Sequence, residues 1–479
     1  MSIETLVKRI QNIMRQDAGV DGDAQRISQL VWMLFLKVYD AKEEFWEFDE
    51  DDFESIIPEE CRWRNWAIDN KDGEALTGDD LLEFINSKLF PTLKELEIDA
   101  FTEKRKAIVK YVFEDANNYM KNGTLLRQVI NVLNEVDFTE NEERHAFNDI
   151  YENILRDLQS AGSSGEFYTP RPVTEFMVEV LKPQVNEKIA DFACGTGGFL
   201  TSALNYMDDQ IKTPEQSEMV QKNLFGIEKK PLPYLLAITN MILHDVDAPN
   251  ILHDNSLSKN VREYKDEDKF DVVLMNPPYG GIEEESIKIN FPVGLQTSET
   301  ADLFIALILY RLKKDGRVAV VLPNSILFGD DKGKIAIKQK LLEECNLHTI
   351  VRLPEGVFSP YTSIPTNLLF FDKTGPTKEI WYFDHPLPNG YSRYSKTRPL
   401  RKSEFELEKA WWDNRVENEY AWKITIDEVI KSNYNLNFRN PYSNSDTDAN
   451  KTTLEMIQDL QKSQEESLNI LKLIEQELS

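Results

Sequence analysis

The stretch Asp191-Phe-Ala-Cys-Gly-Thr-Gly-Gly-Phe-Leu200 decides the fold of this 479-residue chain. It overlaps the apolar run Lys188–Phe192, which has the length of a strand, and it leads into a segment with a helical pattern. Gly195, Gly197 and Gly198 allow the backbone to turn tightly and to approach a ligand closely. The stretch therefore predicts a strand, a glycine loop and a helix, although the same glycines also suit an ordinary tight turn.

Further strands and helices are expected to alternate after this unit. The strand candidates are Asn223–Ile227, Phe270–Met275, Arg317–Leu322 and Leu347–Leu353, and then Asn367–Phe371, a late strand for which an antiparallel direction is considered. The helix candidates between them include Pro231–His244 and Ala301–Lys314. This alternation predicts an α/β fold, a Rossmann-like and mostly parallel sheet with helices on both faces.

The rest of the chain divides by its pattern. We expect a helical N-terminal domain at 1–158, a central domain at 159–373, an irregular aromatic extension at 374–446 and an amphipathic C-terminal helix at 447–479. The helical spacing of the N-terminal part is shown by Leu6, Ile10 and Met14 and again by Leu30, Leu34 and Val38. The polar, glycine-rich segment 159–165 indicates a linker or a mobile loop.

The glycine loop differs from the dinucleotide-binding fingerprint. Its spacing is G-x-G-G, and Asp191 stands before the glycines, where it would repel a pyrophosphate. Glu228 closes the next strand, so both acids should meet at the crevice where parallel strands end. A carboxylate there could accept hydrogen bonds from both hydroxyls of a ribose. A ligand without phosphate and with a cationic end fits this pattern, and S-adenosylmethionine has both properties.

A second motif, Asn276-Pro-Pro-Tyr279, follows the strand candidate Phe270–Met275. The Asn276 side-chain oxygen and the Pro277 carbonyl could accept the two N–H groups of an adenine amino group, which frees its lone pair for methylation. The prolines hold both acceptors in place. Tyr279 offers a flat face on which a base flipped out of a duplex can stack. The alternative is that the tetrapeptide is only structural, as a Pro-Pro turn after a strand.

With these motifs the chain resembles the amino-methyltransferases, and within them the modification subunits of type I restriction–modification systems. The matching pieces are Gly165–Arg171 (GEFYTPR), Asp191–Leu200, Gly226–Glu228, His253–Leu257 (HDNSL), Asn276–Tyr279 and Leu322–Ser325. The resemblance implies a methyltransferase domain that depends on S-adenosylmethionine, preceded by an all-helical domain and followed by a C-terminal helix.

The resemblance also implies which residues form the site, and we expect no metal there. Those expected at the cofactor are Glu166, Phe167, Tyr168, Thr169, Pro170, Arg171, Asp191, Cys194, Gly195, Thr196, Gly198, Glu228, Asp254 and Asn255, and those expected in catalysis are Asn276, Pro277, Pro278 and Tyr279. The choice between Asp254 and Asn255 as the contact on the adenine side stays open. Cys194 stands where the family usually has alanine, which is a change between small residues.

Composition bears on partners and location. The net charge of −28 is unfavourable for holding a DNA duplex alone, so we expect a basic partner or a small basic groove. The acidic residues are densest between Glu43 and Glu60. Three cysteines and five histidines do not form a disulfide or zinc pattern. We find no signal peptide at the start and no membrane span, which favours the cytoplasm.

The partners implied by the resemblance are double-stranded DNA with a flipped-out adenine, a specificity subunit, a second modification subunit and an ATP-dependent restriction subunit. The chain itself has no G-x-x-x-x-G-K-[ST] phosphate loop. The alternatives are a stand-alone adenine DNA methyltransferase and an enzyme with the same tetrapeptide that acts on a protein glutamine or on RNA. A non-catalytic scaffold would require a degraded tetrapeptide, and Asn276–Tyr279 is intact.

Overall fold

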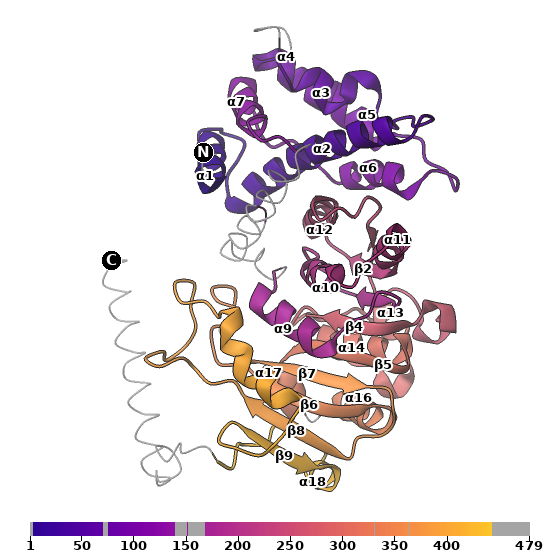
Figure 1. The fold of residues 1–479 in the computed structure, drawn as a ribbon, viewed down its shortest axis with the longest axis vertical. Coiled ribbons are helices and arrows are strands. Elements are labelled where there is room, and N and C mark those ends of the chain that lie inside the picture. The colour runs from indigo at the N-terminus through magenta and orange to yellow at the C-terminus, as the bar shows by residue number, and fades with distance from the viewer. Residues whose placement is uncertain are drawn as a thin grey trace.

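The N-terminal part of the chain is helical. The computed structural model describes residues 3–69, 75–138, 151, 168–329, 331–362 and 364–442 (Figure 1). The N-terminal helices are α1 (Ile3–Met14), α2 (Asp23–Asp49), α3 (Trp63–Trp66), α4 (Gly78–Glu83), α5 (Phe90–Lys94), α6 (Lys104–Glu114) and α7 (Gly123–Leu133). A π-helical segment, Phe84–Leu89, joins α4 to α5. Leu6, Ile10 and Met14 are buried on one face of α1, as their spacing predicts.

The second half of the chain is built on one sheet. Its strands are β1 (Ile189–Asp191), β2 (Leu224–Glu228), β3 (Asn250–His253), β4 (Phe270–Met275), β5 (Leu312–Pro323), β6 (Asn346–Arg352), β7 (Thr366–Asp372), β8 (Glu379–Asp384) and β9 (Ala421–Thr425). The order across the sheet is β3-β2-β1-β4-β5-β7-β6-β8-β9. β7 runs antiparallel to both β5 and β6, while β8 runs parallel to β6. The expected Rossmann-like sheet is confirmed, and so is the antiparallel late strand.

Helices cover both faces of the sheet. They are α9 (Arg171–Leu181), α10 (Gly198–Asp208), α11 (Pro214–Asn223), α12 (Pro231–Leu243), α13 (Glu285–Lys288), α14 (Thr300–Arg311), α15 (Asn324–Phe328), α16 (Lys332–Glu344), α17 (Glu406–Trp412) and α18 (Ile426–Lys431). Alternate residues of β4 enter two different cores. Val272 and Leu274 join the core that includes α9, α10 and α12, whereas Val273 and Met275 join the core of α14 and α16.

The segment predicted as irregular, 374–446, contains regular elements over its described residues 374–442, because β8 and β9 extend the sheet and α17 and α18 follow them. Residues of β8 are buried on both faces, so the sequence lacks the polar alternation of a half-exposed strand. The sequence also gave no sign of β3, an edge strand of four residues. The predicted helix 301–314 ends earlier, at Arg311, and the next three residues already belong to β5. The expected linker and the C-terminal helix lie outside the described residues.

The helical part is docked on the sheet through α2 and α12, which lie against each other (Figure 1). Lys42 of α2 places its Nζ 2.7 Å from an oxygen of Asp245 and 3.1 Å from an oxygen of Asp247, just beyond the end of α12. The indole nitrogen of Trp46 donates a hydrogen bond of 3.3 Å to Asp247. One continuous apolar core joins the two parts. Within the described ranges, no helix has the length and apolarity needed to cross a bilayer.

Candidate active site

A cavity opens where the parallel strands β1, β2 and β4 end. Its lining residues are Thr169, Asp191, Phe192, Ala193, Cys194, Gly195, Thr196, Gly198, Phe199, Glu228, Lys229, Lys230, Asp254, Asn255, Ser256, Asn276, Pro278, Tyr279, Gly281, Glu283, Thr300 and Phe304. The glycine loop and the tetrapeptide, which are about 80 residues apart in the sequence, therefore share one cavity. Such a crevice at the carboxyl ends of strands is where open α/β sheets bind their ligands.

The glycine loop is held in shape by its own backbone and by its neighbours. The Cys194 N–H donates to the Ile227 carbonyl at 3.0 Å, which ties the loop to β2. Gly197 has a φ of 80°, in the left-handed region that favours glycine. A Cβ at Gly198 would lie 2.1 Å from a guanidinium nitrogen of Arg171. A side chain at this position would therefore displace the Arg171 guanidinium from the first turn of α10.

Two buried carboxylates face the cavity. Asp191 is 1% exposed and Glu228 is 7% exposed. The two oxygens of Glu228 accept hydrogen bonds from the backbone N–H groups of Gly195, at 2.9 Å, and Lys230, at 2.8 Å. Burial raises the pKa of Asp191 well above its ordinary value, and the nearby Glu228 adds to this; burial also raises the pKa of Glu228. In the described part of the chain neither carboxylate forms an ion pair, so the pair favours a cationic ligand.

Asp254 and Asn255 both line the cavity beside Glu228. The Asp254 N–H donates to the Glu228 carbonyl at 3.1 Å, and the Asn255 N–H donates to the Asp254 carboxylate at 2.7 Å. The Asn255 side-chain oxygen accepts from the backbone of Leu257 at 3.1 Å. The alternative between Asp254 and Asn255 stays open, because both are positioned at the cavity.

The tetrapeptide places its polar groups in the same cavity. The Asn276 side-chain nitrogen donates to the Thr169 hydroxyl at 3.0 Å, and the Tyr279 hydroxyl donates to the Asn276 side-chain oxygen. Pro278 lines the cavity, whereas Pro277 is buried beneath it. Burial, and to a lesser degree the nearby phenol of Tyr361, raise the pKa of Tyr279 well above its ordinary value. Tyr279 therefore stays a neutral phenol whose ring lies at the cavity.

The segment expected to cover the cofactor is only partly at the cavity. Thr169 lines it, but Tyr168 and Pro170 are buried elsewhere and Arg171 lines a separate hollow beside α9 and α10. The Arg171 guanidinium lies 5.6 Å from the centre of the Tyr168 ring. For these three residues, a direct contact with a ligand remains a prediction. Glu166 and Phe167 lie outside the described residues.

Sequence reasoning missed several residues of the cavity. The Ser256 hydroxyl donates to the Phe192 carbonyl at 2.5 Å, and its place in the HDNSL segment was an available signal. The Thr300 hydroxyl donates to the Glu283 carboxylate at 3.0 Å, on the side of the cavity nearer the tetrapeptide. Those two residues belong to no motif, so the sequence held no sign of them. No cluster of metal-ligating side chains occurs among the residues that the structure describes.

Comparisons with known proteins agree with this geometry. The N-6 DNA methylase family matches residues 142–450, and the HsdM N-terminal domain family matches residues 3–133. The methylase subunit of the type I restriction enzyme EcoEI from Escherichia coli is 54% identical over 451 residues, which cover 92% of this chain and 91% of that protein.

Solved structures show the same likeness. A modification subunit assigned to a type I restriction enzyme of Vibrio vulnificus YJ016 is 43% identical, with a TM-score of 0.81 over 92% of this chain and 97% of that one. A chain from a study of complex assembly in the type I restriction–modification system is 36% identical, with a TM-score of 0.83 over 100% of this chain and 98% of that one. These matches extend over the helical part, the glycine loop and the tetrapeptide, and the chain therefore belongs to the N-6 DNA methylase family as a methylase subunit of the type I restriction enzymes.

Proposed function

We propose that this methylase subunit transfers a methyl group from S-adenosylmethionine to N6 of an adenine that is flipped out of double-stranded DNA. The observation that carries the proposal is the shared cavity, which is lined by Asn276 and Tyr279 as well as by the buried acids Asp191 and Glu228. A base and a methyl donor held in this one cavity would have their reacting atoms close together, which removes much of the entropic cost of transfer.

The residues present fit S-adenosylmethionine. Asp191 and Glu228 are buried and form no ion pair among the described residues, and the amino group and sulfonium of this cofactor would add positive charge to that of the nearby Lys230, which lowers the pKa of Glu228. Each Glu228 oxygen accepts one backbone N–H and keeps a lone pair, so the carboxylate could also accept both ribose hydroxyls. When bound, the cofactor supplies an electrophilic methyl group.

Replacement of Glu228 by Ala should weaken S-adenosylmethionine binding by roughly 1–3 kcal/mol, because a buried charged hydrogen bond is lost. Isothermal titration calorimetry of the full chain measures this directly. Glu263→Ala removes an exposed carboxylate outside the cavity and should leave the affinity unchanged. Equal affinities of the Glu228 variant and the wild type would remove Glu228 from the ribose site.

For catalysis, the acceptors of the tetrapeptide would hold the amino group. Asn276 Oδ1 and the Pro277 carbonyl accept its two N–H groups, which favours a tetrahedral nitrogen with a free lone pair. During transfer of the methyl group from the cofactor, positive charge would develop on this nitrogen, and both acceptor oxygens would stabilise it. The extra proton then leaves the nitrogen for solvent. Asn276 stays neutral throughout, since an amide oxygen is a weak base.

Thr169 is proposed as the residue that orients Asn276, because its hydroxyl accepts the Asn276 side-chain N–H at 3.0 Å. Thr169→Val keeps the shape and removes the acceptor, and we expect the turnover number to fall roughly tenfold or more because the amide is no longer fixed. Thr169→Ser should restore most of the rate. Single-turnover kinetics at saturating cofactor and DNA separate this effect from binding. Equal rates for the Val and Ser variants would show that Thr169 does not orient the amide.

Tyr279 is proposed as the stacking platform for the flipped base. Its hydroxyl donates to the same Asn276 oxygen that the amino group needs, so Tyr279→Phe frees the acceptor and keeps the ring. The Phe variant should therefore retain activity, whereas Tyr279→Ala should weaken productive binding about 10-fold to 100-fold through lost stacking. The Michaelis constant for DNA in methyl-transfer assays measures this. If the Phe variant raises the Michaelis constant for DNA as much as the Ala variant does, DNA binding depends on the hydroxyl, and stacking on the ring does not account for it.

We further propose that the chain works in the cytoplasm within a complex. The expected partners are a specificity subunit, a second copy of this subunit and an ATP-dependent restriction subunit. Support comes from the solved relative that belongs to a study of complex assembly and from the charge of −28, which calls for a basic partner on DNA.

The proposed function is tested by tritiated methyl transfer to duplex DNA, with and without a cognate specificity subunit. The expected product after nuclease digestion is N6-methyladenine, formed at one sequence and only with the partner present. Site-specific product from the chain alone would support a stand-alone enzyme instead. Label found only in RNA or in a protein glutamine would overturn the assignment.

A further inference from the structure

The segment between β8 and α17 is strongly basic in an otherwise acidic chain. From His385 to Ser403 there is no Asp or Glu, and the cations are Arg393, Lys396, Arg398, Arg401 and Lys402. Arg393, Lys396 and Arg398 are exposed, and none of them forms an ion pair with the carboxylates that the structure describes. We call residues 391–401 the basic loop. Its charge contrasts with the net charge of −28 of the whole chain.

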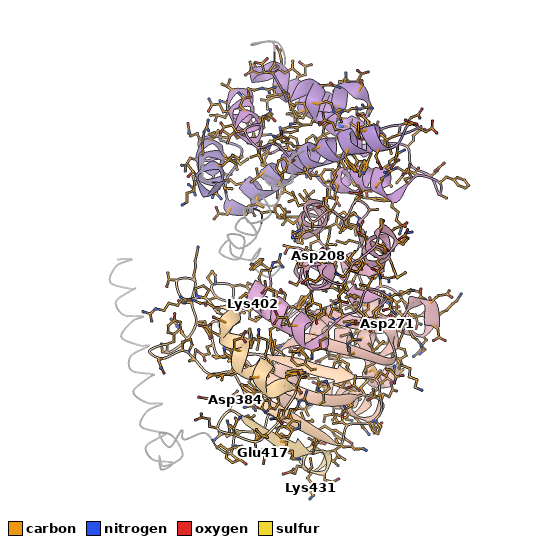
Figure 2. The ribbon with its side chains drawn as sticks, viewed as in Figure 1. Asp208, Asp271, Asp384, Lys402, Glu417 and Lys431 are labelled. Atoms are coloured by element: carbon orange, nitrogen blue, oxygen red, sulfur yellow. The ribbon has the colours of Figure 1, made fainter. Side chains whose placement is uncertain are left out.

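The basic loop begins at the catalytic edge of the sheet. β8 is parallel to β6, and β6 has the same direction as β5 and β4 because both β5 and β6 are antiparallel to β7. The carboxyl end of β8, at Asp384, therefore lies on the edge that also carries Asn276 after β4. Figure 2 shows Lys402, just after the basic loop, beside α9, whereas Lys431 lies at the far end of this half of the molecule.

The base of the loop is fixed by a buried polar network. His385 Nδ1 lies 2.6 Å from a Glu408 oxygen, and His385 Nε2 lies 3.0 Å from the Tyr394 hydroxyl. The side chains of His385 and Glu408 are fully buried. Tyr394 is thus held from inside while Arg393 and Lys396, on either side of it, are at the surface. A loop fixed in this way presents its cations without a large loss of conformational entropy on binding.

The loop also contacts the segment that leads to the active site. The Tyr394 N–H donates to the Glu355 carbonyl at 3.1 Å, and a Cβ at Gly356 would lie 2.1 Å from the Tyr394 carbonyl oxygen. Five residues after Gly356, the phenol of Tyr361 is close enough to Tyr279 to act on it electrostatically. The basic loop therefore packs against Glu355 and Gly356, which precede Tyr361 in the chain.

We infer that the basic loop binds the phosphate backbone of the DNA duplex beside the flipped adenine, through Arg393, Lys396 and Arg398. Guanidinium and ammonium groups that are exposed and form no ion pair are the groups that neutralise phosphates. The Arg398 guanidinium lies 5.4 Å from the centre of the Tyr391 ring, a contact that leaves its charge in place. Lys402 is not part of this contact, because it is paired with Glu175 at 3.0 Å and Glu179 at 2.9 Å. The inference rests on the proposed function for the identity of the polyanion. An acidic surface of a partner subunit would be a different occupant, and the experiment distinguishes it.

The test compares two triple variants of the full chain, assembled with the specificity subunit. R393Q/K396Q/R398Q removes three charges from the basic loop. The matched control K314Q/K378Q/K431Q removes three exposed charges near the opposite edge of the sheet. Lys314 lies early in β5, Lys378 directly before β8 and Lys431 at the end of α18. Both triple variants change the net charge equally. Any difference between their DNA affinities therefore depends on where the removed charges lie. Calorimetry with S-adenosylmethionine and size-exclusion chromatography of the complex verify the fold and the assembly.

Binding of a fluorescent cognate duplex is measured by anisotropy at several salt concentrations, which requires no methyl transfer. The loop variant should bind the duplex at least about tenfold more weakly than the wild type. The slope of log K against log salt should be smaller in magnitude by about 2 to 3, because each lost phosphate contact lowers it by about 0.9. The control should match the wild type. An unchanged slope, or an equal loss in the control, overturns the inference. Failure of the loop variant to assemble assigns the loop to a protein interface and also overturns it.

The same duplex separates this inference from the proposed function. If the wild-type complex binds the duplex but yields no N6-methyladenine, the proposed function fails while the salt slopes still test the loop. If methylation occurs and the loop variant shows the wild-type Michaelis constant for DNA, only the inference about the loop fails. If both the proposed function and the inference hold, the loop variant should keep its turnover number at saturating DNA, because the acceptors at Asn276 are unchanged.

Discussion

Asn276→Ala should lower the rate of methyl transfer about 100-fold or more, while S-adenosylmethionine still binds with near-normal affinity. The side chain of Asn276 makes two hydrogen bonds, to Thr169 and from Tyr279, and neither involves Asp191 or Glu228. The proposed cofactor ligands Asp191 and Glu228 are held by the glycine loop and β2 instead. The loss should therefore appear in the chemical step and not in cofactor binding.

The measurement is single-turnover transfer of tritiated methyl groups to cognate DNA, paired with calorimetry for the cofactor. Asn205→Ala changes an exposed asparagine on α10 outside the cavity and serves as the control. Near-normal transfer by the Asn276 variant would mean that the tetrapeptide has a structural role only. A loss of cofactor affinity equal to the loss of rate would place Asn276 in the cofactor site.

Deletion of residues 451–479 should abolish co-purification with the specificity subunit and, with it, site-specific methylation. These residues lie outside the described part of the chain, so the prediction rests on their sequence. Leu468, Leu471, Ile474 and Leu478 recur at helical spacing, and an apolar stripe of this kind needs a surface to cover it. The resemblance to the modification subunits implies that this stripe packs against helices of a specificity subunit. Cofactor binding should be unaffected.

A matched pair of point variants makes this test sharper. L468D/L471D places two charges in the apolar stripe, whereas N469D/Q476D adds the same charges on the opposite side of the expected helix. Pull-down with a tagged specificity subunit should fail for the first and succeed for the second. Normal assembly of both, or of the deletion variant, would refute the interface. Docking of this helix on its own chain would show instead as a lower unfolding temperature of the isolated subunit.

The sequence predicted the sheet where strands are long, apolar runs. β4 and the apolar end of β5 were placed within a few residues because both are buried on two faces and bounded by polar turns. β3 was missed because a four-residue edge strand with exposed positions has no such pattern. β8 and β9 were missed because their aromatic residues carry no period, and only the pairing of β8 with β6 and of β9 with β8 identifies them as strands.

The candidate site was predictable where each motif follows a strand. The glycine loop and Asn276 follow β1 and β4, and parallel strands bring their ends together. Thr169 could be named from the resemblance, but its contact with Asn276 spans 107 residues and depends on how α9 packs on the sheet. Glu283 and Thr300 reach the cavity through a long connection between β4 and α14, whose path no local pattern predicts.

Helix α12 connects two regions that the sequence keeps far apart. Its Asn240 donates a hydrogen bond of 2.9 Å to the Thr196 carbonyl of the glycine loop, and Asp245 and Asp247 beyond its end hold Lys42 of α2. A displacement of the helical part must therefore be taken up by the same helix that supports the loop. Suppose that a partner which binds at α2 changes the affinity of the glycine loop for its ligand. By thermodynamic reciprocity, the ligand then changes the affinity for that partner by the same factor.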